Sequence, residues 1–313
     1  MRAKYRKALP QLSGDDFLTD GGMETTLIFL KDEDLPHFAA FTLLDTPSGR
    51  TKLRDYYRTY LDYAAEKSVG FILESPTWRA SSDWGDLLSY SPRRLADANR
   101  DAIALMAELR DEYETERTPH VISGNLGPRG DGYRPQSLMS ADEAEAYHSE
   151  QIATFDEAGV DLVSAFTMTY PDEAIGIARA AKARAVPSVI SITTETDGRL
   201  PTGASIGDAI RAIDDATEAS PAYYMINCTH PRHFEDALEA DADWITRVAG
   251  LRANASTRSH AELDEATSLD PGDPDDLAAG YQRVARALPL NIFGGCCGTD
   301  HRHVKAIFEA RLA

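Results

Sequence analysis

Short runs of apolar residues recur along the chain and alternate with stretches that repeat with the period of a helix. The runs are rich in Val, Ile, Leu and Phe and lack regular polar alternation, which is typical of parallel strands covered on both faces. The pattern predicts eight strands, at Phe17–Thr19, Gly70–Leu73, His120–Gly124, Asp161–Ala165, Val186–Ile192, Tyr223–Asn227, Trp244–Gly250 and Leu290–Phe293.

Helix signals lie between the predicted strands. Ser140 and Glu143 have the spacing of a capping box, and Gly159 is placed to end the helix that they open. A second helix is predicted from Asp172, with acidic residues in its first turn and basic ones in its last. Eight alternating strand–helix units indicate an α/β fold with a parallel sheet, the (β/α)8 barrel. A doubly wound sheet is the alternative, but no Gly-x-Gly-x-x-Gly turn follows the first strand.

We expect a single domain over residues 1–313, with the barrel core at about 17–307, because no linker interrupts this pattern. Residues 253–276 are poor in large apolar side chains and rich in Asp, Glu, Ser and Thr. A long loop with at most a short helix is predicted there, after the seventh strand. Loops of that length often act as lids over a site.

Composition narrows the class of protein. The formal net charge is −19, which argues against binding to the phosphates of a nucleic acid. No stretch approaches eighteen apolar residues, so no membrane span is predicted. The basic N-terminus continues into a segment too short and polar for a signal peptide, and we expect a cytoplasmic protein.

The chain has three cysteines, and they are placed unusually. Cys228 lies between Asn227 and Thr229, while Cys296 and Cys297 are adjacent and flanked by glycines. Neighbouring side chains on a strand point to opposite faces, so the pair can converge only where glycine lets the backbone leave strand geometry. Three convergent thiolates form a soft, incomplete tetrahedral shell, which suits Zn²⁺ with one position open for a substrate.

Other interpretations of the cysteines remain. They could be buried and inert, since free cysteine is among the most buried residue types. A disulfide between adjacent cysteines would be strained, and nothing else in the sequence indicates an oxidising compartment. A closed structural zinc site would need a fourth ligand, such as His230 or His301.

The special turns all follow predicted strands. Asp20-Gly21-Gly22 follows the first strand, Glu74 the second and Cys228 the sixth, and the cysteine pair follows the eighth. In a (β/α)8 barrel these strand ends share one face, which is the catalytic face. The fold and the metal site therefore support each other, because Cys228 would meet the distant pair across the mouth of the barrel.

Five segments, in order, resemble the homocysteine S-methyltransferase family: Asp20-Gly-Gly-Met-Glu-Thr-Thr-Leu, Gly124-Asn-Leu-Gly-Pro, Ala158-Gly-Val-Asp-Leu, Ile226-Asn-Cys-Thr and Gly294-Gly-Cys-Cys-Gly-Thr. The resemblance runs from about Phe17 to about Ile307. It implies a zinc-dependent barrel enzyme that methylates the thiol of homocysteine and forms methionine. Cys228, Cys296 and Cys297 would be its metal ligands and catalytic residues.

The resemblance also implies partners and substrate contacts. The partners would be small molecules, a thiol acceptor and a methyl donor. S-methylmethionine is the favoured donor and betaine the second, because the chain lacks cobalamin-binding modules. Asp20, in the turn with Gly21 and Gly22, would contact the ammonium of homocysteine. Asn227 would brace the turn or the substrate, and Trp78 would face a cationic donor through its π face.

Two departures concern the acceptor. Phe166 stands where relatives tend to carry a glutamate that helps to hold the amino acid, and Glu74 stands where they usually carry a small polar residue. Either the carboxylate has moved to Glu74, or Glu74 pairs with Arg79 and the acceptor is not an ordinary α-amino acid. The same chemistry on a different thiol, and a zinc- or thiol-sensing protein without enzymatic activity, therefore stay open as alternatives.

Overall fold

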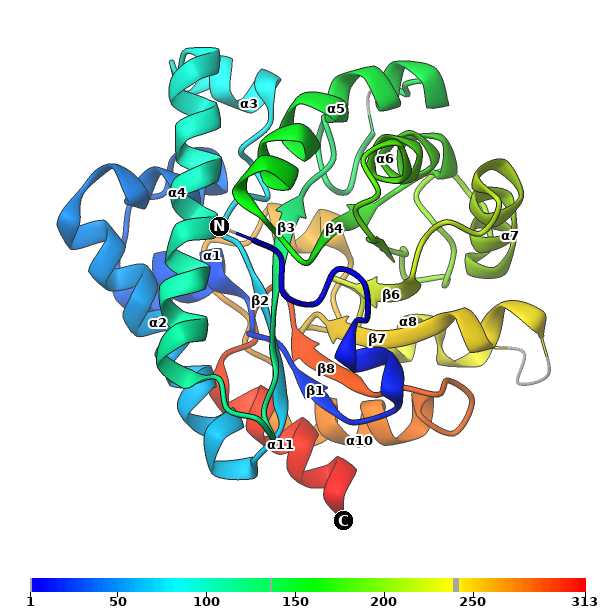
Figure 1. Cartoon of the computed structure of the whole chain (residues 1–313). Helices are drawn as coiled ribbons and strands as arrows, with labels where there is room; N and C mark the ends of the chain where they lie inside the picture. Colours follow the sequence, from blue (N-terminus) through cyan, green and yellow to red (C-terminus); the bar gives the residue numbers. More distant parts are fainter. Residues whose placement is uncertain (1, 136, 239–241) are drawn as a thin grey trace.

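The computed structural model describes residues 2–135, 137–238 and 242–313. Eight parallel strands form a closed barrel in which each strand pairs with the next and the last pairs with the first, with helices around the outside (Figure 1). The (β/α)8 prediction is confirmed. The strands are β1 (Phe17–Leu18), β2 (Gly70–Glu74), β3 (His120–Leu126), β4 (Leu162–Met168), β5 (Ser188–Ile192), β6 (Tyr223–Asn227), β7 (Val248–Ala253) and β8 (Ile292–Gly295).

The seventh strand was predicted too early in the chain. Trp244–Gly250 was expected to be extended, but Trp244 and Ile245 lie in a 3-10 helix and the strand begins at Val248. Both side chains are buried, and Trp244 packs so closely on the helix at Gly207 that an added Cβ there would meet the indole Nε1 at 2.5 Å. In the sequence, a 3-10 turn with buried apolar side chains therefore looks the same as a short buried strand, and the predicted strand was placed too early for this reason.

The outer layer contains seven helices longer than ten residues within the described ranges. They are α2 (Pro47–Lys67), α4 (Pro92–Tyr113), α5 (Ala141–Ala158), α6 (Pro171–Ala183), α7 (Ile206–Thr217), α10 (Pro274–Val284) and α11 (His301–Leu312). Shorter elements are α1 (Met23–Thr25), α3 (Ser82–Leu87), α8 (Pro231–Phe234), α9 (His260–Asp264), the π-turn Thr26–Leu30 and the 3-10 turns Pro10–Ser13, Pro36–Phe38, Ala40–Asp45, Glu235–Ala237 and Asp243–Arg247.

The predicted boundaries of α5 are confirmed by its caps. Ser140 Oγ accepts from the Glu143 backbone N–H at 3.3 Å, and Glu143 Oε2 accepts from the Ser140 backbone N–H at 2.8 Å. Gly159 ends the helix with φ of 87°, in the left-handed region that favours glycine. α6 begins at Pro171, one residue before the predicted start.

The N-terminal segment closes the amino end of the barrel, and Figure 1 shows it crossing in front of the strands. The backbone N–H groups of Lys4 and Tyr5 both donate to Asp161 Oδ1 at 2.7 Å, and Asp161 Oδ2 accepts from Arg110 at 2.9 Å. The barrel interior above this plug is apolar. Its buried cluster comprises Leu9, Phe17, Ile72, Val121, Leu162, Phe166, Val189, Tyr223, Met225 and Ile292. Because this end is filled, a ligand can reach the barrel interior only from the carboxyl ends of the strands.

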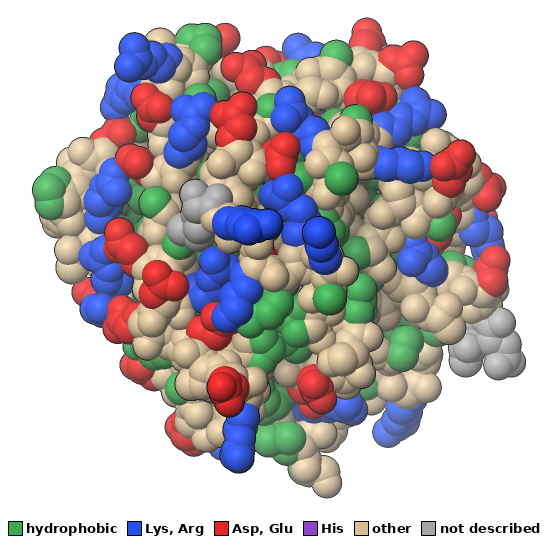
Figure 2. Space-filling model, in the orientation of Figure 1, with side chains coloured by type: hydrophobic (Ala, Val, Ile, Leu, Met, Phe, Trp, Pro, Cys, Tyr) green, Lys and Arg blue, Asp and Glu red, His purple; other side chains and the backbone are tan. Residues whose placement is uncertain are grey.

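Charged side chains of both signs are mixed on one face of the molecule (Figure 2). On the face seen in Figure 2, basic and acidic side chains lie interspersed over the helices. Many of the arginines form ion pairs with nearby carboxylates, such as Arg58 with Glu112 at 2.9 Å. None of the described helices is both long enough and apolar enough to span a membrane.

Candidate metal centre and active site

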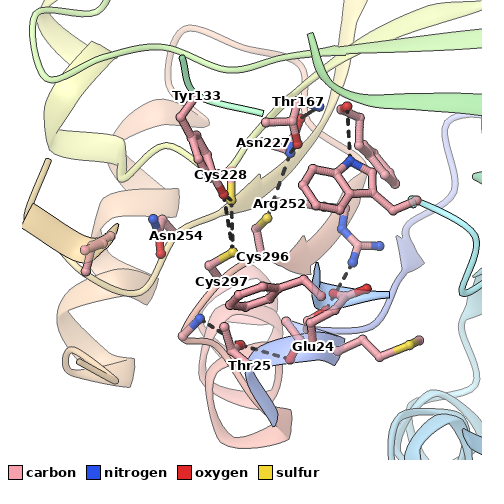
Figure 3. A pocket seen from close by; sticks show the side chains of 18 of the residues that line it. Glu24, Thr25, Tyr133, Thr167, Asn227, Cys228, Arg252, Asn254, Cys296 and Cys297 are labelled. Atoms are coloured by element: carbon pink, nitrogen blue, oxygen red, sulfur yellow. Dashed lines mark hydrogen bonds between the residues drawn. The ribbon is translucent and has the colours of Figure 1, made fainter. Parts of the chain in front are cut away.

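The three cysteine sulfurs meet at the carboxyl end of the barrel, where the sequence placed them. Their Sγ atoms all lie within 4.8 Å of one another, and Cys228 Sγ is 3.4 Å from Cys297 Sγ (Figure 3). Zinc–sulfur bonds of about 2.3 Å in a tetrahedron separate the sulfurs by about 3.8 Å. The triad is therefore compact enough to hold one metal ion after small side-chain adjustments.

The backbone leaves strand geometry at both cysteine segments, as convergence requires. Cys228 has φ of 54°, directly after β6, and its N–H donates to Arg252 O at 3.0 Å. Cys296 N–H donates to Ala253 O at 2.8 Å, and Gly298 follows the pair with φ of 78°. At Gly294 a Cβ would lie 1.9 Å from Thr19 Oγ1, so no larger residue fits between β8 and β1.

Two of the alternatives, a disulfide and a closed site with a histidine ligand, find no support in the geometry. All three cysteines are free thiols, so no disulfide is formed. Among the described His, Cys, Asp and Glu residues, only the three cysteines group closely enough to hold an ion there. His230 instead accepts the Arg232 N–H at 3.2 Å as the N-cap of α8, and His301 is exposed at the start of α11.

Two effects act in opposite directions on the thiols. Burial raises the pKa of Cys228, whereas the hydrogen bond that Cys228 donates lowers the pKa of Cys297 well below its usual value. A divalent ion would supply the positive charge that full ionisation of all three thiols requires.

Tyr133 covers the sulfurs, although no motif in the sequence pointed to this residue. Its hydroxyl lies 3.0 Å from Cys228 Sγ and 3.5 Å from Cys297 Sγ, and its ring lies 4.1 Å from that of His260. His260 in turn bonds to Cys228 O at 2.8 Å. Tyr133 comes from the loop after β3, and His260 begins the short helix α9 after β7, so hydrophobic periodicity singles out neither residue.

Asn227 links the metal site to β4. Its Oδ1 accepts the Thr167 N–H at 2.9 Å, its Nδ2 donates to Thr167 Oγ1 at 3.0 Å, and Nδ2 lies 3.9 Å from Cys296 Sγ. Thr167 has φ of 64°, which a non-glycine residue adopts only when held. These are the contacts of a residue that braces the strand ends.

Asp20 lies at the mouth of the barrel but already has a cationic partner. Arg252, on β7, donates from Nη1 to Asp20 Oδ1 at 2.7 Å, and Tyr56 donates to Asp20 Oδ2 at 3.0 Å. Arg252 Nη2 also donates to Gly21 O at 3.2 Å. Gly22 packs on the cysteine loop, since a Cβ there would lie 2.4 Å from Cys296 O. An incoming ammonium would therefore have to share Asp20 with Arg252.

Glu74 is the carboxylate with an unused oxygen. It is only 3% exposed, its Oε1 accepts from Ser164 Oγ at 3.1 Å, and its Oε2 has no partner. Burial raises the pKa of Glu74 to about 7. Glu74 and Arg79 do not form an ion pair within the described residues, where the cation that acts most on Glu74 is Arg252.

Phe166, where the family resemblance implied a glutamate, places an apolar ring at the end of β4. The Phe166 ring lies 5.0 Å from the Arg252 guanidinium and is nearly fully buried. Trp78 donates from Nε1 to Phe166 O at 3.4 Å, and Arg79 stacks on the Trp78 ring at 4.0 Å. One face of Trp78 is therefore covered by a side chain of the protein itself.

These residues line one cavity of about 450 Å³, a volume ordinary for a small-molecule site. It reaches from Asp20 and Glu74 in the barrel mouth past the three cysteines to the segment after β7. That segment contains α9, and His260, Leu263 and Asp264 of α9 line the outer part. All the residues predicted to contact substrate line this cavity, and among them Asp20 and Asn227 are already hydrogen-bonded to other side chains of the protein.

The chain is similar to proteins of known name. A curated homocysteine S-methyltransferase of Bacillus subtilis, YbgG, is 24% identical over 275 residues, covering 81% of this chain and 80% of that protein. A methionine synthase of Mycobacterium tuberculosis is 24% identical over 228 residues. The matching region spans only 18% of the length of that synthase and of its Mycobacterium leprae counterpart.

The fold matches a solved structure over nearly the whole chain. The homocysteine methyltransferase MmuM of Escherichia coli, in a form described as metallated, superposes with a TM-score of 0.73 at 18% identity, covering 98% of this chain and all of that one. The family model for homocysteine S-methyltransferases matches residues 17–311. The chain therefore belongs to the homocysteine S-methyltransferase family.

Proposed function

We propose that the protein is a zinc-dependent methyltransferase that moves a methyl group from a sulfonium or ammonium donor, S-methylmethionine being favoured, to the thiol of homocysteine, giving methionine. The observation that carries the proposal is the triad of free cysteine sulfurs within 4.8 Å of one another in an accessible cavity. Membership of the homocysteine S-methyltransferase family supports the choice of reaction. Soft thiolate ligands favour zinc over harder divalent ions.

Cys228, Cys296 and Cys297 would hold the ion. When bound, zinc would lower the pKa of an acceptor thiol and keep the sulfur as a nucleophilic thiolate near neutral pH. In the reaction a bond forms between this sulfur and the methyl carbon while the bond from the methyl carbon to the donor heteroatom breaks. The donor leaves with that electron pair as a neutral thioether or amine, so no further acid is needed.

The protein residues mainly position the reactants. Asn227 fixes the end of β4 against the cysteine segments through two hydrogen bonds to Thr167. Tyr133 covers the sulfurs from the side of the β3 loop. Holding two reactants at attack distance removes much of the entropic barrier to a bimolecular transfer.

Glu74 is our proposed contact for the ammonium of homocysteine. Its Oε2 is buried without a partner and Glu74 lines the same cavity as the cysteines, whereas Asp20 is engaged by Arg252. An ammonium needs a nearby negative charge rather than one particular strand. The carboxylate after β2 would therefore replace the one absent at Phe166, with Asp20 as a shared, weaker contact.

A second candidate is the same chemistry on a different thiol. The Phe166 ring and the Asp20–Arg252 pair favour it, because both reduce the negative charge available to an α-ammonium group. This candidate keeps the metal and the methyl transfer and changes only the acceptor. A thiol panel including thiols without an amino group would distinguish it from the first.

Mass spectrometry can test the proposal directly. The zinc-loaded protein is incubated with deuterated homocysteine together with one donor, which is S-methylmethionine in one reaction and betaine in another. Labelling the acceptor distinguishes product methionine from the methionine that S-methylmethionine releases. We expect labelled methionine with at least one donor and none with the Cys297→Ser protein. If zinc is bound and no donor gives labelled methionine, homocysteine is not the acceptor.

A further inference from the structure

Arg79 is a buried cation that lines the cavity and has no part in the proposed methyl transfer. It follows β2 in the segment before α3, and its guanidinium is sandwiched between Trp78 at 4.0 Å and Trp84 at 3.8 Å. The residue is only 8% exposed and lines the same cavity as the cysteines. Two aromatic faces thus fix the plane of the guanidinium and leave only its N–H edge available for hydrogen bonds.

That edge is largely unused. Within the described residues the side chain makes one hydrogen bond, from Nη1 to Gly130 O at 3.1 Å, and Nε is buried without a partner. No described carboxylate comes within 4.0 Å of it as an ion pair. Asp131 is the strongest nearby negative charge, but its Oδ1 already accepts two backbone N–H groups at 2.8 Å.

A cation removed from water without a partner is unfavourable, and proteins usually pair such groups. Burial lowers the pKa of Arg79 to about 10, against an ordinary value of 12.5. Arginine presents its N–H groups in a planar fork that matches a carboxylate. A fixed, buried fork with free donors beside a cavity is therefore preorganised for an anionic group of a ligand.

We propose that Arg79 binds the carboxylate of the methyl donor, so that the enzyme selects small sulfonium or ammonium donors that carry a carboxylate. The proposal rests on the proposed methyl transfer and adds the substrate class of the donor. It assigns the donor to the rim of the cavity at Trp78 and Arg79, and the acceptor to the deeper part at Glu74.

Two observations assign Arg79 to the donor. Arg252 is the other guanidinium that lines the cavity, and its Nε, Nη1 and Nη2 already donate to Gly295 O, Asp20 and Gly21 O. Arg79 donates to Gly130 O in the loop after β3 and stacks on Trp78 and Trp84, whereas Glu74 accepts from Ser164 on β4. The two side chains therefore have different neighbours in the one cavity that they line together with the cysteines.

The test compares donors with and without the carboxylate. Isothermal titration calorimetry on the zinc-loaded protein, without any thiol, measures binding of S-methylmethionine and of its carboxamide. We expect the unaltered protein to prefer the acid by about tenfold or more, as a charge-assisted hydrogen-bonded pair implies. In Arg79→Met the preference should fall to within about threefold, and Arg79→Lys should lie between them.

Controls separate this role from packing. Arg94→Met removes another arginine stacked on an aromatic ring, at 3.9 Å from Tyr90, outside the cavity, and should leave the donor preference intact. Circular dichroism and thermal melting establish that each variant folds, and Arg79→Lys keeps the test informative if Arg79→Met does not. An unchanged preference for the acid in the folded Arg79 variants overturns the proposal, as does a selective loss of homocysteine binding.

The two proposals fail in different ways. If the unaltered protein forms methionine but Arg79→Met raises KM for S-methylmethionine no more than for its carboxamide, only the assignment of Arg79 is wrong. If no thiol is methylated while the donor still binds with an Arg79-dependent preference, the methyl transfer itself is wrong.

Discussion

Arg252 Nη1 lies 2.7 Å from Asp20 Oδ1, so the barrel mouth contains a buried ion pair between β7 and the turn after β1. Both side chains are less than one-tenth exposed. The pair uses the carboxylate that the sequence motif assigns to the substrate. The ion pair also joins β7 to the turn after β1. It therefore has a structural role as well as an effect on substrate recognition.

Arg252→Met should therefore destabilise the protein through Asp20. Removing the guanidinium leaves a buried carboxylate without its cation, and breaking such a pair costs about 3–5 kcal/mol. Denaturant unfolding measures this. The double variant Asp20→Asn/Arg252→Met should recover a large part of the loss, because no unpaired charge remains. Equal stability of the single and double variants would contradict a dominant role for the ion pair.

Serine at Cys296 or Cys297 should abolish tight metal binding and methyl transfer together. Two thiolates and a hydroxyl bind zinc far more weakly than three thiolates, since the hydroxyl stays protonated at neutral pH. Competition with a chromophoric chelator measures affinity, and product formation measures activity. Activity retained by a variant that no longer holds zinc would remove the metal from the proposed reaction.

Glu74 should make amino-acid binding depend on pH. Because burial raises its pKa to about 7, the carboxyl of the empty protein is largely protonated below that pH. An ammonium ligand needs the carboxylate, so affinity should rise up to about tenfold per unit as pH increases toward 7 and then level off. In Glu74→Gln binding should be weaker and this rise should be lost.

Methionine is the appropriate probe for that experiment. It carries the ammonium but no thiol proton, so zinc-linked thiol ionisation does not contribute. Burial also raises the pKa of Glu24 to about 7. Glu24 is present in both the unaltered protein and Glu74→Gln, so its contribution to the pH dependence cancels when the two are compared. The empty protein gives an independent check. The free energy of unfolding of the empty protein should fall as pH rises from about 4.5 to 7, because in that range the folded state binds more protons than the unfolded state. This fall should be smaller in Glu74→Gln.

Tyr133→Phe should weaken metal binding without preventing it. The substitution keeps the ring against His260 and removes the hydroxyl that lies 3.0 Å from Cys228 Sγ. Loss of a group hydrogen-bonded to a metal ligand typically lowers affinity by about 10- to 100-fold. Tyr63→Phe is a suitable control, since its hydroxyl contacts only Lys305 O at 3.4 Å far from the cavity. Unchanged zinc affinity would show that the hydroxyl does not support the metal ligands.

The barrel and the cysteine triad could be predicted because each depends on a regular rule. Apolar runs such as Tyr223–Asn227 mark buried parallel strands, and the barrel brings their carboxyl ends to one face whatever their distance in sequence. Cys228 and Cys297, 69 residues apart, meet for that reason. The rule failed at Trp244, where apolar side chains buried in a 3-10 turn have the same pattern as a strand.

The charged groups of the site could not be predicted in this way. Arg252 lies within a strand, but the sequence does not say that its side chain points inward to Asp20. The sandwich of Arg79 depends on Trp84 from the next helix, and Tyr133 reaches the sulfurs from a loop without periodicity. Pairings of this kind depend on side-chain direction across elements, which neither propensity nor spacing encodes.

The separation of the cysteines along the chain also limits when the metal can be acquired. A growing polypeptide that has passed Cys228 offers a single thiol until Cys296 is added 68 residues later, and β7 and β8 lie between these two cysteines. Stable coordination must therefore come after the last strand has been added beside β1. Apoprotein, rather than a partly made chain, would be the species that competes for zinc in the cell.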